Sequence, residues 1–154
     1  MQERPDHILL AEDSPADVGL VRLALREQNF NHILHVATDG EEAIAFIEKA
    51  DLDSNVAGPD LLLLDMHLPR YSGEQILQRL RSTERYAQTP VVVMTASESP
   101  EDQAKADKHA ALHYFRKPFS LTEFLELGRI VRSIVAPEAR ARNQRHDKEA
   151  TGAK

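Results

Sequence analysis

The feature that most constrains the fold is an alternation of short apolar runs with longer amphipathic stretches. Apolar runs bounded by helical patterns are typical of βα units around a parallel sheet. Right-handed crossovers then predict an α/β fold, a five-stranded parallel sheet in a doubly wound (βα)5 sandwich, with its ligand site at the carboxyl ends of the strands. The five expected strands are residues 8–11, 33–36, 61–64, 91–94 and, less clearly apolar, 113–115.

Helix starts are marked by a capping residue three positions before an acid. The pairs are Ser14 with Asp17, Asp39 with Glu42, and Ser120 with Glu123. Core faces at helical spacing are expected from Val18, Val21 and Leu25 in the first helix and from Phe124, Leu127, Val131 and Ile134 in the last. Residues 100–111 have helical propensity but almost no large apolar side chains, so this helix should be weakly docked and able to shift.

A chain of 154 residues is long enough for one domain with a sizeable core. We expect an N-terminal extension at 1–6, a domain at 7–136 and a charged tail or helix extension at 137–154. Residues 51–59 are expected to form a loop before the third strand.

Composition narrows the function classes. The net charge of −6 provides no basic footprint for nucleic acid. Without Cys there is no disulfide framework, thiolate metal site or Cys nucleophile, which fits a reducing compartment. No signal peptide and no apolar run of about 18 residues is present, so we expect a cytoplasmic protein that does not enter the membrane.

Acidic side chains follow two of the expected strands. Glu12 and Asp13 come after the first and Asp65 after the third, while Thr95 ends the fourth and Lys117 follows the fifth. Parallel neighbouring strands would bring all five into one crevice. Three adjacent carboxylates repel one another unless a cation lies among them, and Mg²⁺, which prefers oxygen ligands and keeps several waters, suits such a site.

This arrangement is suited to phosphoryl transfer, which needs positioning and charge neutralisation more than covalent work from the protein. Asp65 would attack as a carboxylate nucleophile, Thr95 would donate to a phosphoryl oxygen and Lys117 would pair with another. Singly, each residue has an ordinary interpretation: Asp13 could cap a helix, Thr95 suits any strand, and a Lys-Pro pair means little. Their joint placement is what favours a site.

With these residues in view, the chain resembles the receiver domains of bacterial response regulators over nearly all of residues 7–135. The resemblance is carried by EDSP at 12–15, DGEEA at 39–43, DMHLP at 65–69 with Gly73, VMTA at 93–96 and KPF at 117–119. It implies a CheY-like, flavodoxin-like receiver sandwich in a two-component system. It also implies a phosphoacceptor signalling protein, not an enzyme proper, that assists its own phosphorylation and dephosphorylation.

The resemblance also implies roles. A sensor histidine kinase would phosphorylate Asp65; Glu12, Asp13, Asp65 and the backbone carbonyl of His67 would hold Mg²⁺; and Pro118 would follow a cis bond. Thr95 and Tyr114 would form the switch, with Tyr114 rotating as Thr95 moves toward the phosphoryl group and the face of the fourth helix, fifth strand and fifth helix changing shape. The chain departs from the family at Ala110-Ala111, where Gly-Ala is usual, and His67 occupies a variable position beside the site.

Loop lengths, the segments 80–84 and 89–93 and the lack of an output domain resemble stand-alone receivers that partner bacterial phytochrome kinases. The implied partner is a light-sensing histidine kinase, and a homodimer through the last helix and the tail is expected.

The residues also leave three other functions open. The first is a pseudo-receiver that acts only as a binding module. The second is a Mg²⁺-dependent aspartyl phosphohydrolase, which usually has a second acid two residues after its nucleophile, where this chain has His67. The third is a flavin-binding electron carrier, which needs a phosphate-binding loop after the first strand.

Overall fold

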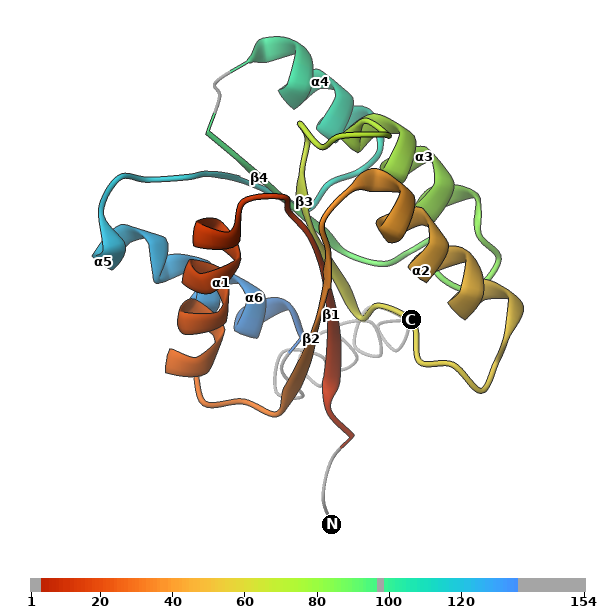
Figure 1. Ribbon diagram of the computed structural model, residues 1–154, viewed down its shortest axis with the longest axis horizontal. Helices are drawn as coiled ribbons and strands as arrows, with labels where there is room; N and C mark the ends of the chain where they lie inside the picture. Colours follow the sequence, from red (N-terminus) through yellow and green to blue (C-terminus); the bar gives the residue numbers. More distant parts are fainter. Residues whose placement is uncertain (1–3, 97–98, 136–154) are drawn as a thin grey trace, which may run out of the picture.

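The computed structural model describes residues 4–96 and 99–135. The tail or helix extension expected at 137–154 lies outside these residues. Five parallel strands form one sheet in the order β2-β1-β3-β4-β5, which confirms the predicted fold class (Figure 1). The strands are β1 (Asp6–Ala11), β2 (His32–Ala37), β3 (Leu61–Asp65), β4 (Val91–Thr95) and β5 (His113–Arg116).

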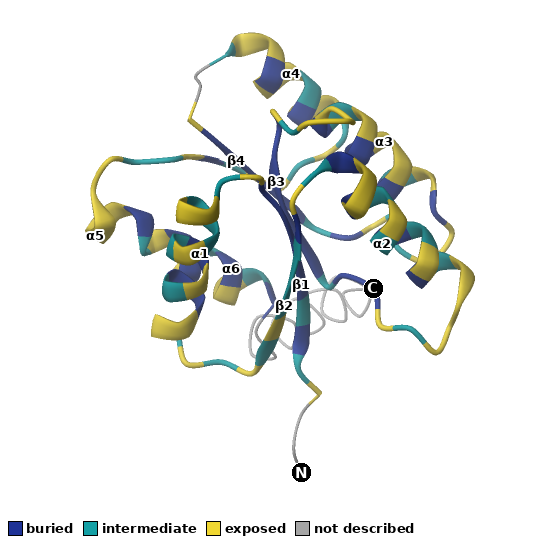
Figure 2. Cartoon of the chain, viewed as in Figure 1, coloured by how far each residue is buried: buried dark blue, intermediate teal, exposed yellow. Residues whose placement is uncertain are grey.

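Helices cover both faces of the sheet. They are α1 (Pro15–Glu27), α2 (Gly40–Leu52), α3 (Gly73–Ser82), α4 (Pro100–Lys108), α5 (Leu121–Phe124) and α6 (Glu126–Val135). Apolar side chains of α2, α3 and α4 pack on one face, and those of α1, α5 and α6 pack on the other (Figure 1). β3 and β4 are buried along their whole length, as Figure 2 shows, because both of their faces are covered. None of the described helices is long and apolar enough to cross a membrane.

The three predicted helix caps are confirmed. The side-chain oxygens of Ser14, Asp39 and Ser120 accept hydrogen bonds from the backbone three residues ahead, at 3.3, 2.8 and 3.4 Å. Two further caps, Ser72 and Ser99, begin α3 and α4 in the same way. Each cap satisfies a backbone N–H that the first helical turn leaves without an intrahelical partner. The positions at which the helices begin are therefore set locally.

The helix α4 is held by few apolar contacts. Its buried residues are Asp102 and Ala106, so a single small side chain and a carboxylate face the interior. This burial agrees with the weak docking that we expected, while its ability to shift stays a prediction. The helix ends at Lys108 and is followed by Ala110, which has a φ of 58°. Ala111 N–H then donates to Ala106 O at 3.0 Å. This is a Schellman ending, in which Gly would avoid the strain that Ala bears.

One arginine clamps that strained turn to the loop before β4. The Arg81 guanidinium donates to the carbonyl oxygens of His109 and Thr89 at 2.8 and 2.6 Å. Burial lowers the pKa of Arg81 from its ordinary value. Ala110 stands where the family usually has Gly. It is accommodated by its own left-handed backbone conformation and by Arg81, whose side chain binds the carbonyl of the neighbouring His109.

The last helix is interrupted at Leu125, between α5 and α6, and not continuous as its apolar stripe suggested. The backbone tightens there, because Gly128 N–H donates to Leu125 O, three residues back, at 3.1 Å. Just beyond this tightened turn, α6 lies against α1. A Cβ on Gly128 would lie 2.1 Å from the carbonyl oxygen of Ala24, so the two helices meet backbone to backbone.

This contact gives a prediction with a defined sign. Gly128→Ala should lower the free energy of unfolding by about 1–3 kcal/mol, because the new methyl group overlaps a main-chain carbonyl that cannot move alone. Gly19→Ala is the matched control, since a Cβ on this exposed glycine of α1 meets nothing within 4 Å. The control should gain up to about 1 kcal/mol from helix propensity. Urea unfolding measures both, and a gain in both variants would contradict the close contact.

A histidine pair links β1 to β2. The ring Nε2 of His35 lies 2.9 Å from Nδ1 of His7, and the ring packs 4.8 Å from that of Phe46 in α2. The Asp60 carboxylate is near, since it accepts from the backbone N–H of His7 at 2.8 Å. Burial, and then the charge of His7, lower the pKa of His35 from its ordinary value of 6.5.

The lowered pKa predicts loss of stability in acid. Because the unfolded chain binds the proton more readily, the contribution of His35 is present above its ordinary pKa and is lost as the pH falls through that value and through the folded pKa. We expect His35→Gln to flatten the fall in unfolding free energy between about pH 7.5 and 5.5. His113→Gln, at an exposed position, should leave the slope unchanged. Parallel slopes for His35→Gln and the unsubstituted protein would count against this role.

Candidate phosphoacceptor site

The register of the sheet brings the predicted site residues to one level. Ala11 lies beside Leu64, and Thr95 lies beside Arg116. Each site residue is at the end of its strand or one step beyond, so Glu12, Asp65 and Lys117 reach the same carboxyl edge. Strand pairing alone therefore assembles groups that are up to 105 residues apart.

Three carboxylates form a cluster at this edge. Oxygens of Glu12, Asp13 and Asp65 all lie within 4.8 Å of one another. Glu12 is fully buried and Asp65 is 8% exposed, whereas Asp13 faces solvent. Burial raises the pKa of Glu12 from its ordinary value, although hydrogen bonds from Lys117 and from the backbone N–H of Ser14 oppose this effect. A donor set of clustered carboxylate oxygens fits a hard divalent cation.

Lys117 is the positive charge of the cluster. Its Nζ donates to Glu12 Oε2 at 2.7 Å, to Asp17 Oδ2 at 2.8 Å and to Asp65 Oδ2 at 3.2 Å. Burial disfavours the charged form, but the hydrogen bonds to Asp17 and Glu12 outweigh it and raise the pKa of Lys117. Its backbone N–H also donates to Thr95 O at 2.7 Å. The ammonium is thus protonated and held among three acids.

The expected cis bond before Pro118 is wrong. No peptide bond among the described residues is cis, so the Lys117-Pro118 bond is trans. An X-Pro bond prefers trans by about 0.5–1 kcal/mol, and in this isomer Lys117 already makes both its side-chain and its backbone contacts. The site geometry does not require the rarer isomer.

Thr95 and Tyr114, the two residues expected to form a switch, lie together. Thr95 ends β4 and is buried, and its side chain hydrogen-bonds to that of Tyr114. Burial, and then the negative charge of Asp102, raise the pKa of Tyr114 from its ordinary value. Tyr114 is half-buried and packs against the apolar cluster of α2, α3 and α4. The two residues therefore contact each other, and Tyr114 also packs on the helical layer that includes α4.

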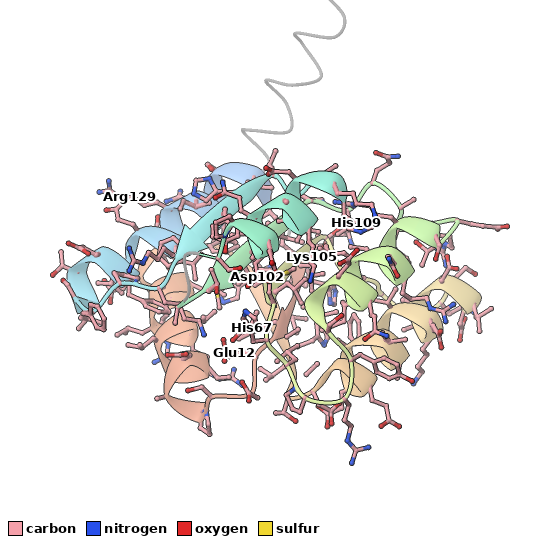
Figure 3. The ribbon with its side chains drawn as sticks, turned by 90° about the horizontal axis from the view of Figure 1, so that it is seen from above. Glu12, His67, Asp102, Lys105, His109 and Arg129 are labelled. Atoms are coloured by element: carbon pink, nitrogen blue, oxygen red, sulfur yellow. The ribbon has the colours of Figure 1, made fainter. Side chains whose placement is uncertain are left out.

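His67 lies between Asp65 and α4. Its backbone N–H donates to Asp65 Oδ1 at 2.9 Å, and its ring Nε2 reaches Asp102 Oδ2 at 2.5 Å (Figure 3). The resemblance implied a metal-binding role for its backbone carbonyl and an influence of its side chain on the phosphoryl lifetime, but no contact between that side chain and α4.

Sequence reasoning missed Asp17 and Asp102. The sequence does place Asp17 in a capping box, but its carboxylate turns to Lys117, while the backbone N–H of Ser14 donates to Glu12 at 3.1 Å instead. Asp102 looks like one more acid in a polar helix start, and only the packing of α4 shows it turned inward. An acid three residues after a cap is a weak signal for either role.

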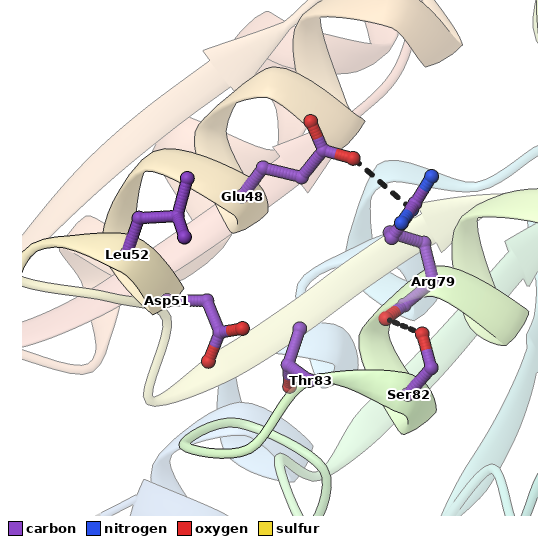
Figure 4. A pocket seen from close by; sticks show the side chains of 6 residues that line it. All are labelled: Glu48, Asp51, Leu52, Arg79, Ser82 and Thr83. Carbon is purple, nitrogen blue, oxygen red and sulfur yellow. Dashed lines mark hydrogen bonds and ion pairs between the residues drawn. The ribbon is translucent and has the colours of Figure 1, made fainter.

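A second hollow lies between the C-terminal ends of α2 and α3 (Figure 4). Its charged groups pair with each other, Glu48 with Arg79 at 3.1 Å, and the Ser82 hydroxyl donates to a carbonyl of its own helix. The C-terminal ends of these helices are at the edge of the sheet opposite the acidic cluster. The chemistry of the carboxyl edge therefore has no counterpart there.

The fold and the site define a class of protein, a doubly wound α/β protein with an acidic, lysine-bearing site at the carboxyl edge of its sheet. A family model described as the response regulator receiver domain matches residues 8–128. The chain belongs to this family, the receivers of two-component systems.

Relatives with known names agree with this assignment. Response regulator Rcp1 of Synechocystis sp. is 37% identical over 98 residues, which cover 64% of this chain and 67% of Rcp1. Transcriptional regulatory protein TrcR of Mycobacterium tuberculosis is 39% identical over 121 residues, 79% of this chain but 43% of TrcR. This chain thus spans less than half the length of that relative.

Solved structures share the fold. The phosphorylated cyanobacterial phytochrome response regulator RcpA has a TM-score of 0.78 at 27% identity, covering 88% of this chain and 97% of RcpA. The Mn²⁺-bound form of Rcp1 has a TM-score of 0.74 at 31% identity, covering 84% and 93%. The bacteriophytochrome response regulator RtBRR has a TM-score of 0.67 at 28% identity, covering 80% and 75%.

Proposed function

We propose that this receiver accepts a phosphoryl group on Asp65 from the phosphohistidine of a sensor histidine kinase. The observation that carries the proposal is the cluster itself. A carboxylate that is 8% exposed lies among two further acids and a lysine whose Nζ is 3.2 Å from its oxygen. A structural salt bridge needs one acid and one base, whereas here one ammonium contacts Glu12, Asp17 and Asp65, and Asp13 lies beside two of these acids.

In the transfer, a carboxylate oxygen of Asp65 attacks phosphorus. The new O–P bond forms as the N–P bond of the phosphohistidine breaks, and the kinase's nitrogen keeps the electron pair. Lys117 neutralises charge on one phosphoryl oxygen, and the Thr95 hydroxyl donates to another once it leaves Tyr114. The later hydrolysis that such a site assists returns phosphate to solvent and restores the carboxylate.

Glu12, Asp13, Asp65 and the backbone carbonyl of His67 would hold Mg²⁺. When bound, the ion supplies positive charge that offsets the repulsion between carboxylates and phosphoryl oxygens. The residues fit it, because three carboxylates lie within 4.8 Å and burial raises the pKa of Glu12, so that its ionised form gains from a nearby cation.

Phosphorylation then acts on the face made by α4, β5 and α5. Movement of Thr95 toward the phosphoryl group releases Tyr114, and the two already share a hydrogen bond that this movement would break. The result is a change of surface and not a chemical product.

The proposed partner is a light-sensing histidine kinase of the phytochrome type in the cytoplasm, and the proposed assembly is a homodimer. Support comes from three similar structures, since RcpA and RtBRR are described as phytochrome and bacteriophytochrome response regulators and RPA3017 of R. palustris as acting in red light signalling. The phosphohydrolase alternative has less support, because the residue two positions after Asp65 is a histidine engaged with α4.

Incubation with acetyl phosphate and Mg²⁺ tests the chemistry without the kinase. Intact-mass spectrometry should show one added phosphoryl group that chelation of Mg²⁺ prevents. Absence of uptake in Mg²⁺ would overturn the proposal and favour the pseudo-receiver. Phosphotransfer from a purified panel of histidine kinases, light-sensing and not, then identifies the partner by the fastest transfer.

A further inference from the structure

The contact between His67 and Asp102 connects Asp65 to α4 by a route other than Thr95 and Tyr114. The Asp65 carboxylate accepts from the backbone N–H of His67, and the ring of the same residue donates to Asp102 on α4. Two hydrogen bonds thus connect the Asp65 carboxylate to the first turn of α4. Figure 3 labels His67 and Asp102.

Asp102 is not an ordinary first-turn acid. Acids at this position favour the positive end of the helix dipole and normally remain in water. The side chain of Asp102 is 9% exposed, whereas that of His67 is 61% exposed, so the carboxylate is the desolvated member of the pair. Burying a carboxylate is costly unless it is paired, and His67 supplies the pairing. Asp102 also influences Tyr114, whose pKa its charge raises.

Within residues 99–108, apolar burial contributes little to holding α4. Ala106 is the one buried apolar residue of the helix. At the other end, Lys105 and His109 approach Glu74 of α3 at 3.9 and 3.6 Å, distances longer than hydrogen bonds. Such loose pairs contribute little. Besides the Ser99 cap, the contact between His67 and Asp102 is therefore a main tertiary contact of the first turn of α4.

We propose that His67 and Asp102 form a positioning link that holds α4 against the phosphoacceptor loop until Asp65 is phosphorylated. This rests on the proposed phosphorylation of Asp65. The phosphoryl group on Asp65 adds negative charge that repels the Asp102 carboxylate, with His67 between them. It also offers the imidazole of His67 a competing hydrogen-bond acceptor. The link opens, and the first turn of α4 is released.

Reciprocity fixes what mutation should do. The link stabilises the unphosphorylated state relative to the phosphorylated one. A mutation that removes the link should therefore favour the phosphorylated state by the factor that the link had contributed. Asp102→Ala should therefore bind beryllofluoride, a phosphoryl analogue, about five-fold or more tightly in Mg²⁺. His67→Ala should act in the same direction, and the double variant should exceed neither single variant, because both remove one contact.

Hydrogen exchange of the amides of α4 supplies the second measurement. In the unsubstituted protein, exchange at 102–108 should be slow and should quicken when beryllofluoride binds. In Asp102→Ala it should be fast in both states. Asp102→Asn keeps an oxygen that can accept from the imidazole and should retain part of the protection. Glu101→Ala is the matched control, since it removes an exposed acid from the same turn.

The outcomes separate the link from the proposed function. Failure of the unsubstituted protein to bind beryllofluoride would overturn the function, while fast exchange in free Asp102→Ala would still support the link. Equal exchange and equal affinity in Asp102→Ala and Glu101→Ala would overturn the link. Faster exchange in Asp102→Ala with unchanged beryllofluoride affinity would also overturn it, because Asp102 would then stabilise the helix without opposing phosphorylation.

Discussion

Asp65→Asn is expected to abolish phosphoryl uptake from acetyl phosphate and Mg²⁺ while the protein stays folded. The amide is nearly the same size as the carboxylate and keeps an oxygen that can accept from the backbone N–H of His67, which donates at 2.9 Å in the native chain. It lacks the anionic oxygen that attacks phosphorus. Intact-mass spectrometry should show no added group, and circular dichroism should be unchanged.

Asp60→Asn is the matched control, because Asp60 precedes the same strand at its other end. Its carboxylate binds Arg4 at 2.7 Å and the backbone N–H of His7 at 2.8 Å, away from the acidic cluster. Phosphoryl uptake should persist in this variant. An added phosphoryl mass on Asp65→Asn at the native level would remove Asp65 from its role, and peptide mapping would then show which residue carries the group.

Lys117→Met should destabilise the metal-free protein severely and then allow Mg²⁺ to restore much of the loss. Methionine keeps the apolar stem but leaves Glu12, Asp17 and Asp65 without their shared cation. Removing one partner of a buried ion pair costs about 3–5 kcal/mol, and the Lys117 side chain is 11% exposed. Because the ammonium no longer competes for the carboxylates, Mg²⁺ should bind more tightly and raise the unfolding free energy by mass action.

Chemical unfolding in chelator and in Mg²⁺ measures both effects. Lys105→Met is the control, since Lys105 is half-exposed and 3.9 Å from its acid, and its stability should change by less than about 1 kcal/mol in either condition. Phosphoryl uptake by Lys117→Met should be slow despite bound metal, because the charge that positions a phosphoryl oxygen is gone. Equal stability of Lys117→Met with and without Mg²⁺ would contradict shared use of the carboxylates.

The sequence predicted the strands and the helix starts, because neighbouring residues decide both. Apolar runs located all five strands, most clearly β3 and β4, which are covered on both faces and must be apolar throughout. Ser14, Asp39 and Ser120 capped the helices as expected. The end of α2 was less predictable. It runs to Leu52, inside the expected loop, because the Asp51 carboxylate accepts from the backbone N–H of Arg85 at 3.0 Å, a residue that sequence periodicity cannot connect to it.

The site was predictable where position on a strand decides it. Glu12, Asp13, Asp65 and Lys117 meet because parallel strands share a carboxyl edge. Asp17 and Asp102 were not predictable, since each is an acid in a first helical turn and only tertiary packing separates a buried carboxylate from a solvated one. The isomer of the bond before Pro118 depends on differences of about 1 kcal/mol and was assigned wrongly by resemblance.

The bond between Lys117 and Glu12 spans 105 residues, and this has a consequence for how the chain matures. During synthesis the acids of β1 and β3 exist before the lysine that follows β5 has been made, so their mutual repulsion opposes early closure of the sheet. Pairing of the last strand relieves it. Because such non-local contacts cost loop-closure entropy before they stabilise the fold, we expect the acidic cluster and its lysine to come together only when the whole sheet is in register.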